Sequence, residues 1–241
     1  MKPFTFVTIC TFCFFSVELF SQGDAKNNPG LSGIALLKTM HEKYYHKPCK
    51  SYTFSQKNTH YRNDSMIKHS EWHEAIEFPD KFRINFGDKS EGNFVLLNRD
   101  SVYKYKAGSQ VNRRADSSSI LLLIGGMYYR ELEDVLGRLK NKGYDLHTLS
   151  EQDWNGSPAL VIGALHNDLV SNQIWVDKKT LCVLRVIETI NVIDIMDMRF
   201  EAHQKWCGGF VETKVSFRRN GHLEQVEEYY DLKKTDSFSE Q

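Results

Sequence analysis

Strand-like runs separated by only a few residues constrain the fold of this chain more than any other feature of its sequence. In the first half they cover residues 52–61, 71–78, 81–86, 93–97 and 101–105. A parallel connection needs a crossover of a dozen or more residues, and these linkers are too short to provide one. The sequence therefore predicts an antiparallel meander. Within 81–86, apolar and polar side chains alternate, which predicts a strand with one buried face.

The second half of the chain continues in the same way. Its runs cover residues 144–154, 158–165, 172–176, 182–189, 197–206, 211–218 and 223–230. Asn155–Gly156, between the first two runs, is the strongest short signal of a two-residue hairpin. A sheet of roughly ten or more strands tends to curl strongly.

Two amphipathic helices interrupt the strands. Residues 30–46 carry apolar side chains at helical spacing, and Asn28–Pro29 supplies a favourable N-cap and first helical position. Residues 127–142 repeat the pattern and end in a basic turn before Gly143. Strands, helices and strands in this order predict an α+β fold, a large curved antiparallel sheet with helices gathered on one face.

A short, wholly apolar segment precedes the second helix. Residues Ile120, Leu121, Leu122, Leu123 and Ile124 have no polar side, and Gly125 and Gly126 follow them as a candidate hinge. The segment is either ordinary core or the movable cover of an apolar cavity. Runs that are apolar on both faces, such as 94–97 and 181–184, favour the cavity, because a sheet with one solvent-facing side should alternate more cleanly. We expect a ligand to contact apolar side chains of this segment, of the residue after the glycines and of two strands. They are Ile120, Leu121, Leu122, Leu123, Ile124, Met127, Phe82, Ile84, Phe86, Phe94 and Leu96.

The N-terminus resembles an export signal. Lys2, an apolar stretch over residues 4–15 and small or polar residues at 21–23 predict a signal peptide of residues 1–22. A single domain over 23–231 and a polar tail over 232–241 should follow. The chain has 31 basic and 31 acidic residues, so its net charge gives no reason to expect a nucleic-acid partner. We expect a monomer.

Three cysteines remain after the signal peptide, which is too few for a disulfide framework. Cys182 and Cys207 could form one bridge if their strands are neighbours. The other interpretation is a set of unreactive thiols.

Signatures of catalysis are absent from the sequence, which has no Gly-x-Ser-x-Gly elbow, no P-loop and no Gly-x-Gly-x-x-Gly. His69 and His73 have metal-ligand spacing only on a helix, and on a strand they would lie about 13 Å apart. We therefore expect no catalytic residue, no metal and no cofactor. Arg113 and Arg114 form a small basic patch, either a solvated loop or a contact for an anionic group at a cavity mouth.

Two local patterns resemble LolA-like proteins, the periplasmic carriers of outer-membrane lipoproteins. Phe78-Pro79-Asp80-Lys81-Phe82-Arg83 is similar to that family's Pro-x-Lys-Phe-Arg segment. Residues 173–180, Gln-Ile-Trp-Val-Asp-Lys-Lys-Thr, running on to Leu184-Arg185-Val186, resemble its strand-turn-strand. Residues 120–124 stand where the family has a Leu-rich lid helix. The resemblance covers nearly the whole mature chain in the order of elements.

The resemblance implies an incomplete β-barrel with helices on its concave face as a lid. It further implies a non-enzymatic periplasmic carrier that holds lipid or lipoprotein acyl chains for transfer toward the outer membrane. Its protein partners would be an inner-membrane transporter or an outer-membrane acceptor. Residues 127–142 would form a longer second helix than the family usually has. Two alternatives stay open: an envelope sensor or adaptor that binds a regulatory protein partner, and a hydrolase, which no motif supports.

Overall fold

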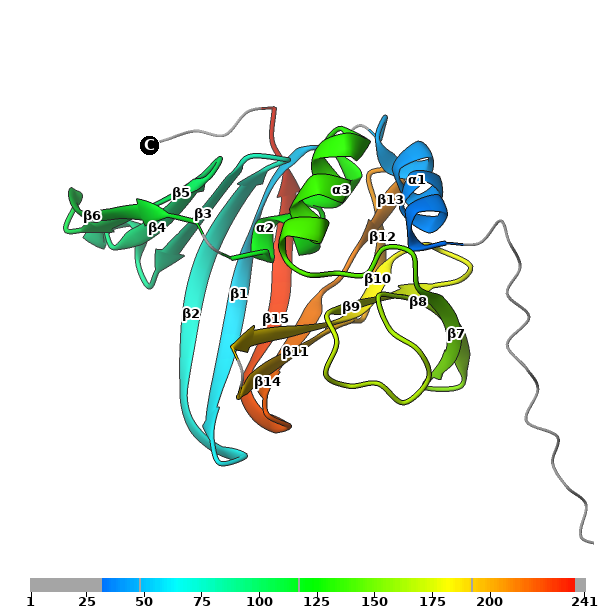
Figure 1. The fold of residues 1–241 in the computed structure, drawn as a ribbon. Helices are drawn as coiled ribbons and strands as arrows, with labels where there is room; N and C mark the ends of the chain where they lie inside the picture. Colours follow the sequence, from blue (N-terminus) through cyan, green and yellow to red (C-terminus); the bar gives the residue numbers. More distant parts are fainter. Residues whose placement is uncertain (1–31, 48, 117, 192, 237–241) are drawn as a thin grey trace, which may run out of the picture.

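A large antiparallel sheet forms most of the molecule in the computed structural model, which describes residues 32–47, 49–116, 118–191 and 193–236 (Figure 1). Within these ranges the strands follow the order β6-β5-β4-β3-β2-β1-β15-β14-β11-β10-β9-β8-β7. They are β1 (Ser51–Arg62), β2 (Ser65–Glu77), β3 (Lys81–Phe86), β4 (Phe94–Asn98), β5 (Ser101–Lys106), β6 (Ser109–Ala115), β7 (Leu149–Trp154), β8 (Ser157–Ile162), β9 (Gln173–Asp177), β10 (Val183–Asn191), β11 (Asp194–Glu201), β14 (Lys214–Arg219) and β15 (His222–Lys234). A separate hairpin joins β12 (Gln204–Trp206) to β13 (Gly209–Val211).

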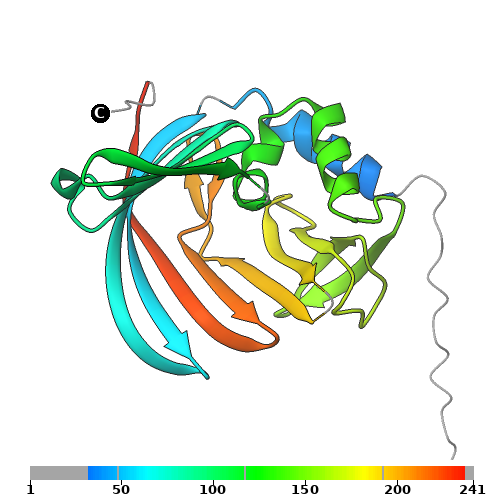
Figure 2. The same cartoon turned by 60° about the vertical axis from the view of Figure 1, so that its left-hand side comes forward.

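The sheet is strongly bent and does not close. β6 and β7 are its two edges, and no hydrogen-bonded pairing joins them in the described part of the chain. Figure 2 shows the sheet curving so that its two halves face each other across the molecule. An unclosed, curved antiparallel sheet is consistent with an incomplete barrel.

Tight hairpins set the register of neighbouring strands. Asn155 and Gly156 both have positive φ, 53° and 83°, and join β7 to β8 as the sequence predicted. Such left-handed pairs match the twist of the two strands. The turn at Ala107–Gly108 has the same signature and leads into β6, a strand that the sequence pattern missed. β6 was missed because it is exposed along its whole length and has no apolar alternation.

Three short α-helices pack against this sheet: α1 (Gly33–Tyr44), α2 (Ile120–Leu123) and α3 (Leu132–Asn141). Short 3-10 turns also occur at Lys89–Glu91 and Gly126–Tyr128. None of the helices in the described ranges has the length and apolar character needed to cross a membrane.

The helix boundaries differ from the prediction. α1 begins after Ser32, whose Oγ accepts a hydrogen bond from the backbone N–H of Ala35 at 3.2 Å, and it ends at Tyr44. The expected cap at Asn28–Pro29 lies outside the described residues. The long second helix over 127–142 is wrong, because a 3-10 turn and an extended Glu131 separate Met127 from the ten residues of α3.

Other boundaries move by smaller amounts. β2 begins at Ser65, six residues before the predicted start at residue 71. β15 continues to Lys234, which pairs with Tyr52, so the sheet extends into the predicted polar tail. Residues 144–148 precede β7 and are not part of it.

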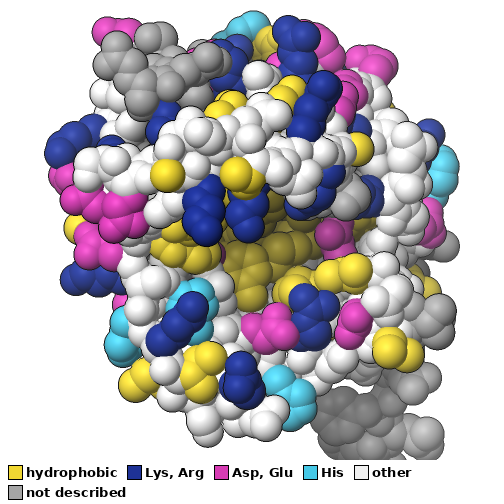
Figure 3. Space-filling view, turned by 90° about the vertical axis from the view of Figure 1, so that its left-hand side faces the viewer, with side chains coloured by type: hydrophobic (Ala, Val, Ile, Leu, Met, Phe, Trp, Pro, Cys, Tyr) yellow, Lys and Arg dark blue, Asp and Glu magenta, His cyan; other side chains and the backbone are white. Residues whose placement is uncertain are grey.

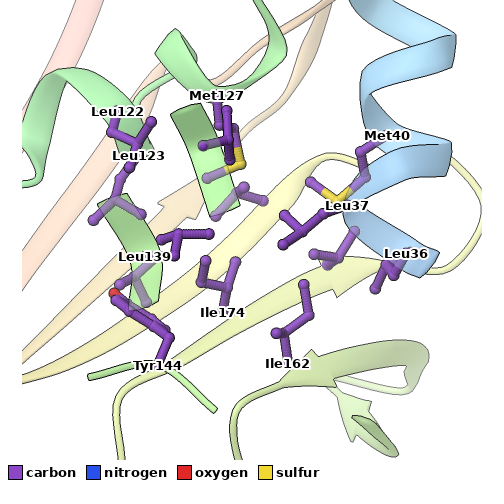
Figure 4. Close-up of a cluster of buried hydrophobic side chains, with 14 of the residues drawn as sticks. Leu36, Leu37, Met40, Leu122, Leu123, Met127, Leu139, Tyr144, Ile162 and Ile174 are labelled. Atoms are coloured by element: carbon purple, nitrogen blue, oxygen red, sulfur yellow. The ribbon is translucent and has the colours of Figure 1, made fainter. Parts of the chain in front are cut away.

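Two clusters of buried apolar side chains meet at α2. One cluster lies between the three helices and the strands β8–β11, and Figure 4 shows part of it. The other lies on strands β1–β5. Leu122 and Leu123 belong to the first cluster and Leu121 to the second. A buried side chain of this size stabilises the fold by about 1.5–3 kcal/mol, so α2 anchors both halves of the core.

The disulfide bond joins Cys49 to Cys207, with their Cα atoms 5.5 Å apart. The predicted Cys182–Cys207 alternative is therefore wrong. Cys207 lies in the turn between β12 and β13, and this hairpin reaches the segment before β1. Cys182 is a buried free thiol whose Sγ lies 3.9 Å from Tyr44 Oη.

The prediction that β3 buries one face is also wrong. Arg83 and Asn85 are buried as well as Phe82. The guanidinium carbon of Arg83 lies 3.9 Å from the centre of the Phe94 ring, and Arg83 Nε donates to Asn85 Oδ1. Aromatic side chains of the next strands therefore cover this polar face.

Candidate ligand-binding site

Two small cavities lie on either side of Ile124, the residue that follows α2. The larger cavity has a volume of about 100 Å³. The smaller cavity has a volume of about 50 Å³ and lies toward the disulfide bond. Tyr52, Ile124 and Glu212 border both. Figure 3 shows a face of the molecule hollowed to a floor of hydrophobic side chains, with Lys and Arg side chains around it.

Strands β1–β4 supply most of the apolar wall of the larger cavity. Side chains on one face of these strands border it, among them Phe54, Trp72, Ile76, Phe82, Ile84 and Leu97. The register explains why these residues meet, because Ile76 pairs with Phe82 and Phe82 pairs with Leu97. Directly paired residues share a face of the sheet.

The segment Ile120–Ile124 divides between cavity and core. Ile120 and Ile124 border the larger cavity. Leu121, Leu122 and Leu123 are 5%, 7% and 1% exposed and lie in the two core clusters. Met127 also lies in the core. Of the predicted contact residues in this segment, Ile120 and Ile124 stand at the wall of the larger cavity, and Leu123 and Ile124 at that of the smaller one.

The predicted strand residues are placed unequally. Phe82 and Ile84 border the larger cavity. Phe86 lies on the same face but packs edge-on against Trp72 at 5.1 Å between ring centres. Phe94 and Leu96 lie on the opposite face, because Leu96 pairs with Arg83 and the alternate residue Leu97 pairs with Phe82. Residues 94–97 are apolar on both faces, so the sequence alone does not indicate which alternate residues turn inward.

Gly125 and Gly126 stand where side chains do not fit. Gly125 has φ of 143°, and a Cβ there would lie 2.7 Å from the Phe78 ring. A Cβ at Gly126 would lie 2.4 Å from the backbone oxygen of Leu121. The two glycines thus allow the chain after α2 to pack closely against Phe78 and against the backbone of Leu121.

Replacing Gly126 by Ala should lower the free energy of unfolding by about 1–3 kcal/mol, because the new methyl group overlaps backbone that cannot rotate away. Urea unfolding followed by circular dichroism would measure this change. The matched control is Gly137→Ala in α3, where no atom lies within 4 Å. That variant should gain roughly 0.5–1 kcal/mol from helix propensity. Equal effects of the two variants would contradict the steric role of Gly126.

Arg113 and Arg114 do not line either apolar cavity. Both lie on the exposed edge strand β6. Arg113 borders a polar surface hollow with Asp80 and Asp100, and its guanidinium carbon lies 5.4 Å from the Tyr103 ring centre. Arg114 donates to the backbone oxygen of Ala115.

His69 and His73 lie on β2 and make cross-strand contacts. His73 Nδ1 lies 2.9 Å from Ser55 Oγ, and His69 Nδ1 lies 3.2 Å from Thr59 Oγ1. Both contacts join β2 to β1, so the pair belongs to a strand, as the sequence indicated.

Three acidic residues line the larger cavity, and sequence reasoning missed them. They are Glu74 on β2, Glu212 between β13 and β14, and Glu227 on β15. Burial raises the pKa of Glu212 to about 8 and that of Glu227 to about 7, and it holds the pKa of Glu74 well above its usual range. One signal was present in the sequence, because Glu74 shares strand parity with the apolar Trp72 and Ile76.

Three solved structures resemble the chain over most of its length. A LolA superfamily protein from Nitrosomonas europaea has a TM-score of 0.57 at 12% identity, covering 86% of this chain and 95% of its own. A DUF1329 family protein from Desulfovibrio piger has a TM-score of 0.60 at 16% identity, covering 86% and 93%. A Vibrio parahaemolyticus domain described as an outer membrane lipoprotein-sorting protein has a TM-score of 0.61 at 12% identity, covering 86% and 94%.

At the level of sequence, no protein-family profile and no curated protein matches the chain. The identities to the solved structures are low, so the likeness lies in the three-dimensional arrangement. The curved, unclosed sheet and the three helices agree with the resemblance that residues 78–83 and 173–186 indicated. This chain has the LolA-like fold.

Proposed function

We propose that this protein is a non-enzymatic carrier that holds lipid or lipoprotein acyl chains beside α2. The position of Ile124 is the observation that carries the proposal, because its side chain borders two neighbouring cavities with largely apolar walls. The structural likeness to the Vibrio parahaemolyticus domain, which is described as lipoprotein-sorting, also supports this proposal. In this proposal the carrier works in the periplasm, toward the outer membrane, and the signal peptide predicted from the sequence supports that location.

Binding requires α2 to move. Cavities of about 100 Å³ and 50 Å³ are smaller than typical ligand pockets, which range over about 300–1,000 Å³. Displacing Ile120 and Ile124 would join the two cavities into one. Each buried methylene group of the incoming chain would then contribute about 0.8 kcal/mol. In this mechanism Gly125 and Gly126 absorb the backbone rotation, and α2 acts as the lid.

The small volume of the two cavities also fits a second candidate function, that of a sensor or adaptor. A sensor or adaptor that binds a regulatory protein needs no internal space, and the small cavities fit that role without any movement. Gentle purification from cell envelopes followed by native mass spectrometry separates the two. A co-purifying mass of a lipid or an acylated protein supports the carrier, and a bare chain or a bound unacylated protein supports the adaptor.

Replacing Ile124 by Ala should strengthen the binding of a neutral apolar probe such as N-phenyl-naphthylamine by up to about fiftyfold. The reason is that three carbon atoms, worth about 0.8 kcal/mol each, need no longer be displaced by the probe. Fluorescence titration would measure the affinity. Ile67→Ala on β2 is the matched control, because that side chain is 49% exposed. Unchanged or weaker binding by Ile124→Ala would count against a site at this residue.

A further inference from the structure

The larger cavity combines apolar walls with acidic groups, and no cation from the described residues lines it. Glu74, Glu212 and Glu227 border it, whereas the linings of both cavities contain no Lys or Arg. Buried carboxyl groups in proteins are normally paired with a cation or a donor. The residues that line the two cavities therefore supply no Lys or Arg to balance this cluster.

The three carboxyl groups differ in their own hydrogen bonds. Glu227 accepts from Tyr229 Oη and Gln225 Nε2, each at 2.7 Å, so both of its oxygens are occupied. Glu212 is held through its own backbone N–H. Glu74 is 3% exposed and borders the cavity, and no donor within residues 32–236, as far as they are described, hydrogen-bonds to it.

A second acceptor on the same face lacks a partner. Gln56 on β1 is 1% exposed, and its Oε1 has no hydrogen bond in the described structure. Gln56 pairs with Trp72 on one side and Tyr229 on the other, and both of these line the larger cavity. The amide nitrogen of Asn58, two residues further along β1, also lacks a partner, and both side chains lie behind the residues that line the cavity rather than in its lining.

We propose that the larger cavity selects an amphiphile whose alkyl chain carries a positively charged amine, with the ammonium group held between Glu74 and Glu212. This inference rests on the proposed function and names the chemical class of its ligand. An ammonium group brings three N–H donors to a site in which the carboxyl group of Glu74 has none. The faces of Tyr52, Phe54 and Trp72 in the same wall also attract a cation. A carboxylate head group would instead meet like charges once these glutamates are ionised.

Binding of an ammonium group should release a proton. The pKa of Glu212 is raised to about 8 by burial and by the charge of Glu227, so Glu212 is protonated in the empty cavity near neutral pH. Pairing with a cation requires the ionised carboxylate, and the carboxyl proton passes to solvent. Affinity should therefore rise with pH until it passes about 8, by up to roughly tenfold per unit for one proton.

The other titratable groups that face this cluster stay neutral over that range. Burial raises the pKa values of Tyr52, Tyr128 and Tyr229, and it lowers the pKa of His203 at the smaller cavity. Glu227, with a pKa raised to about 7, and Glu74, with a pKa further above its usual range, are the groups that titrate together with Glu212. The pH dependence thus reports on the three carboxyl groups.

Three probes with one chain length test the head group. Isothermal titration calorimetry would measure the affinities of decylammonium, decanol and decanoate for the mature protein at pH 6 and pH 8, below micelle-forming concentrations. At pH 8 decylammonium should bind roughly tenfold more tightly than decanol, and decanoate should bind most weakly. Decylammonium affinity should rise roughly tenfold or more from pH 6 to pH 8, whereas decanol affinity should stay constant.

A double variant, Glu74→Gln with Glu212→Gln, should lose the preference for decylammonium and keep its affinity for decanol. Glu228→Gln is the matched control, because Glu228 is an exposed neighbour of Glu227 on the other face of β15. Equal binding of decylammonium and decanol by the wild type would overturn the inference alone, and so would a preference that survives in the double variant. Failure of all three probes to bind would overturn the proposed carrier function as well.

Discussion

Removing the Cys49–Cys207 disulfide bond should lower the free energy of unfolding by about 5 kcal/mol. The two cysteines are 158 residues apart, and the entropy gained by the unfolded chain grows with the length of the loop that is released. The bond also holds the β12–β13 hairpin against the segment before β1, where Cys49 lines the smaller cavity. Urea unfolding of a Cys49→Ala, Cys207→Ala double variant would measure the loss.

Cys182→Ala is the control for this experiment, because Cys182 is a free buried thiol. It removes a sulfur atom from the core and leaves the disulfide intact, so it should cost about 1 kcal/mol. A double variant that unfolds at the same urea concentration as Cys182→Ala would show that the bond is absent from the native protein. The mass of the unreduced wild type provides an independent check.

Replacing Asp197 by Asn should cost about 3–5 kcal/mol, because it leaves the buried cation of Arg185 without its partner. Arg185 and Asp197 are 9% and 8% exposed, and Nε and Nη2 of the arginine donate to the two carboxylate oxygens at 2.8 and 2.9 Å. Arg185 also lies between Trp154 and Trp175, 5.5 and 5.3 Å from their ring centres. The cation therefore has no route to solvent when the carboxylate is removed. Chemical denaturation at pH 7 would measure the change.

Two matched variants separate the ion pair from general disruption. Asp231→Asn breaks the exposed pair with Lys233 and should change stability by less than about 1 kcal/mol. Arg185→Met combined with Asp197→Leu should recover most of the loss, since an apolar pair of similar volume leaves no charge buried. A double variant no more stable than Asp197→Asn would contradict the assignment.

The same carboxylate predicts acid sensitivity. Burial acts to raise the pKa of Asp197, but its hydrogen bonds to Arg185 and Arg199 outweigh burial, and the pKa is lowered. A lowered pKa means that this stabilisation is present above the unfolded value of about 3.9 and is lost as pH falls through the folded value. Wild-type stability should therefore fall below about pH 4 more steeply than that of Asp197→Asn.

The sequence predicted those parts of the fold that depend on local signals. The hairpin at Asn155–Gly156, the strand β3 and the helix α1 each carry a short pattern that only one conformation satisfies. β6 was missed because an edge strand in solvent needs no apolar face. The second helix was predicted too long because the apolar spacing continues across the 3-10 turn at Gly126–Tyr128 and the extended Glu131, which separate Met127 from α3.

The site was only partly predictable for a different reason. The apolar segment after residue 119 is visible in the sequence, but whether each of its residues faces core or cavity depends on which strands pack beneath it. Phe94 and Leu96 could not be told from Val95 and Leu97 without the register of β3 and β4. The carboxyl groups of Glu74 and Glu227 come together only because β15 pairs with β1, and that pairing joins residues about 170 positions apart.

β15 lies between β1 and β14, and in the described structure it alone connects the two halves of the sheet. The strand that unites the molecule is thus far from its partner β1 in the sequence, which gives the native topology a high contact order and a slow folding step. A nascent chain that has not yet reached residue 222 exposes two open strand edges and invites aggregation. Truncation near the C-terminus should therefore be as damaging as the loss of the first strand, even though those final residues look like a polar appendage.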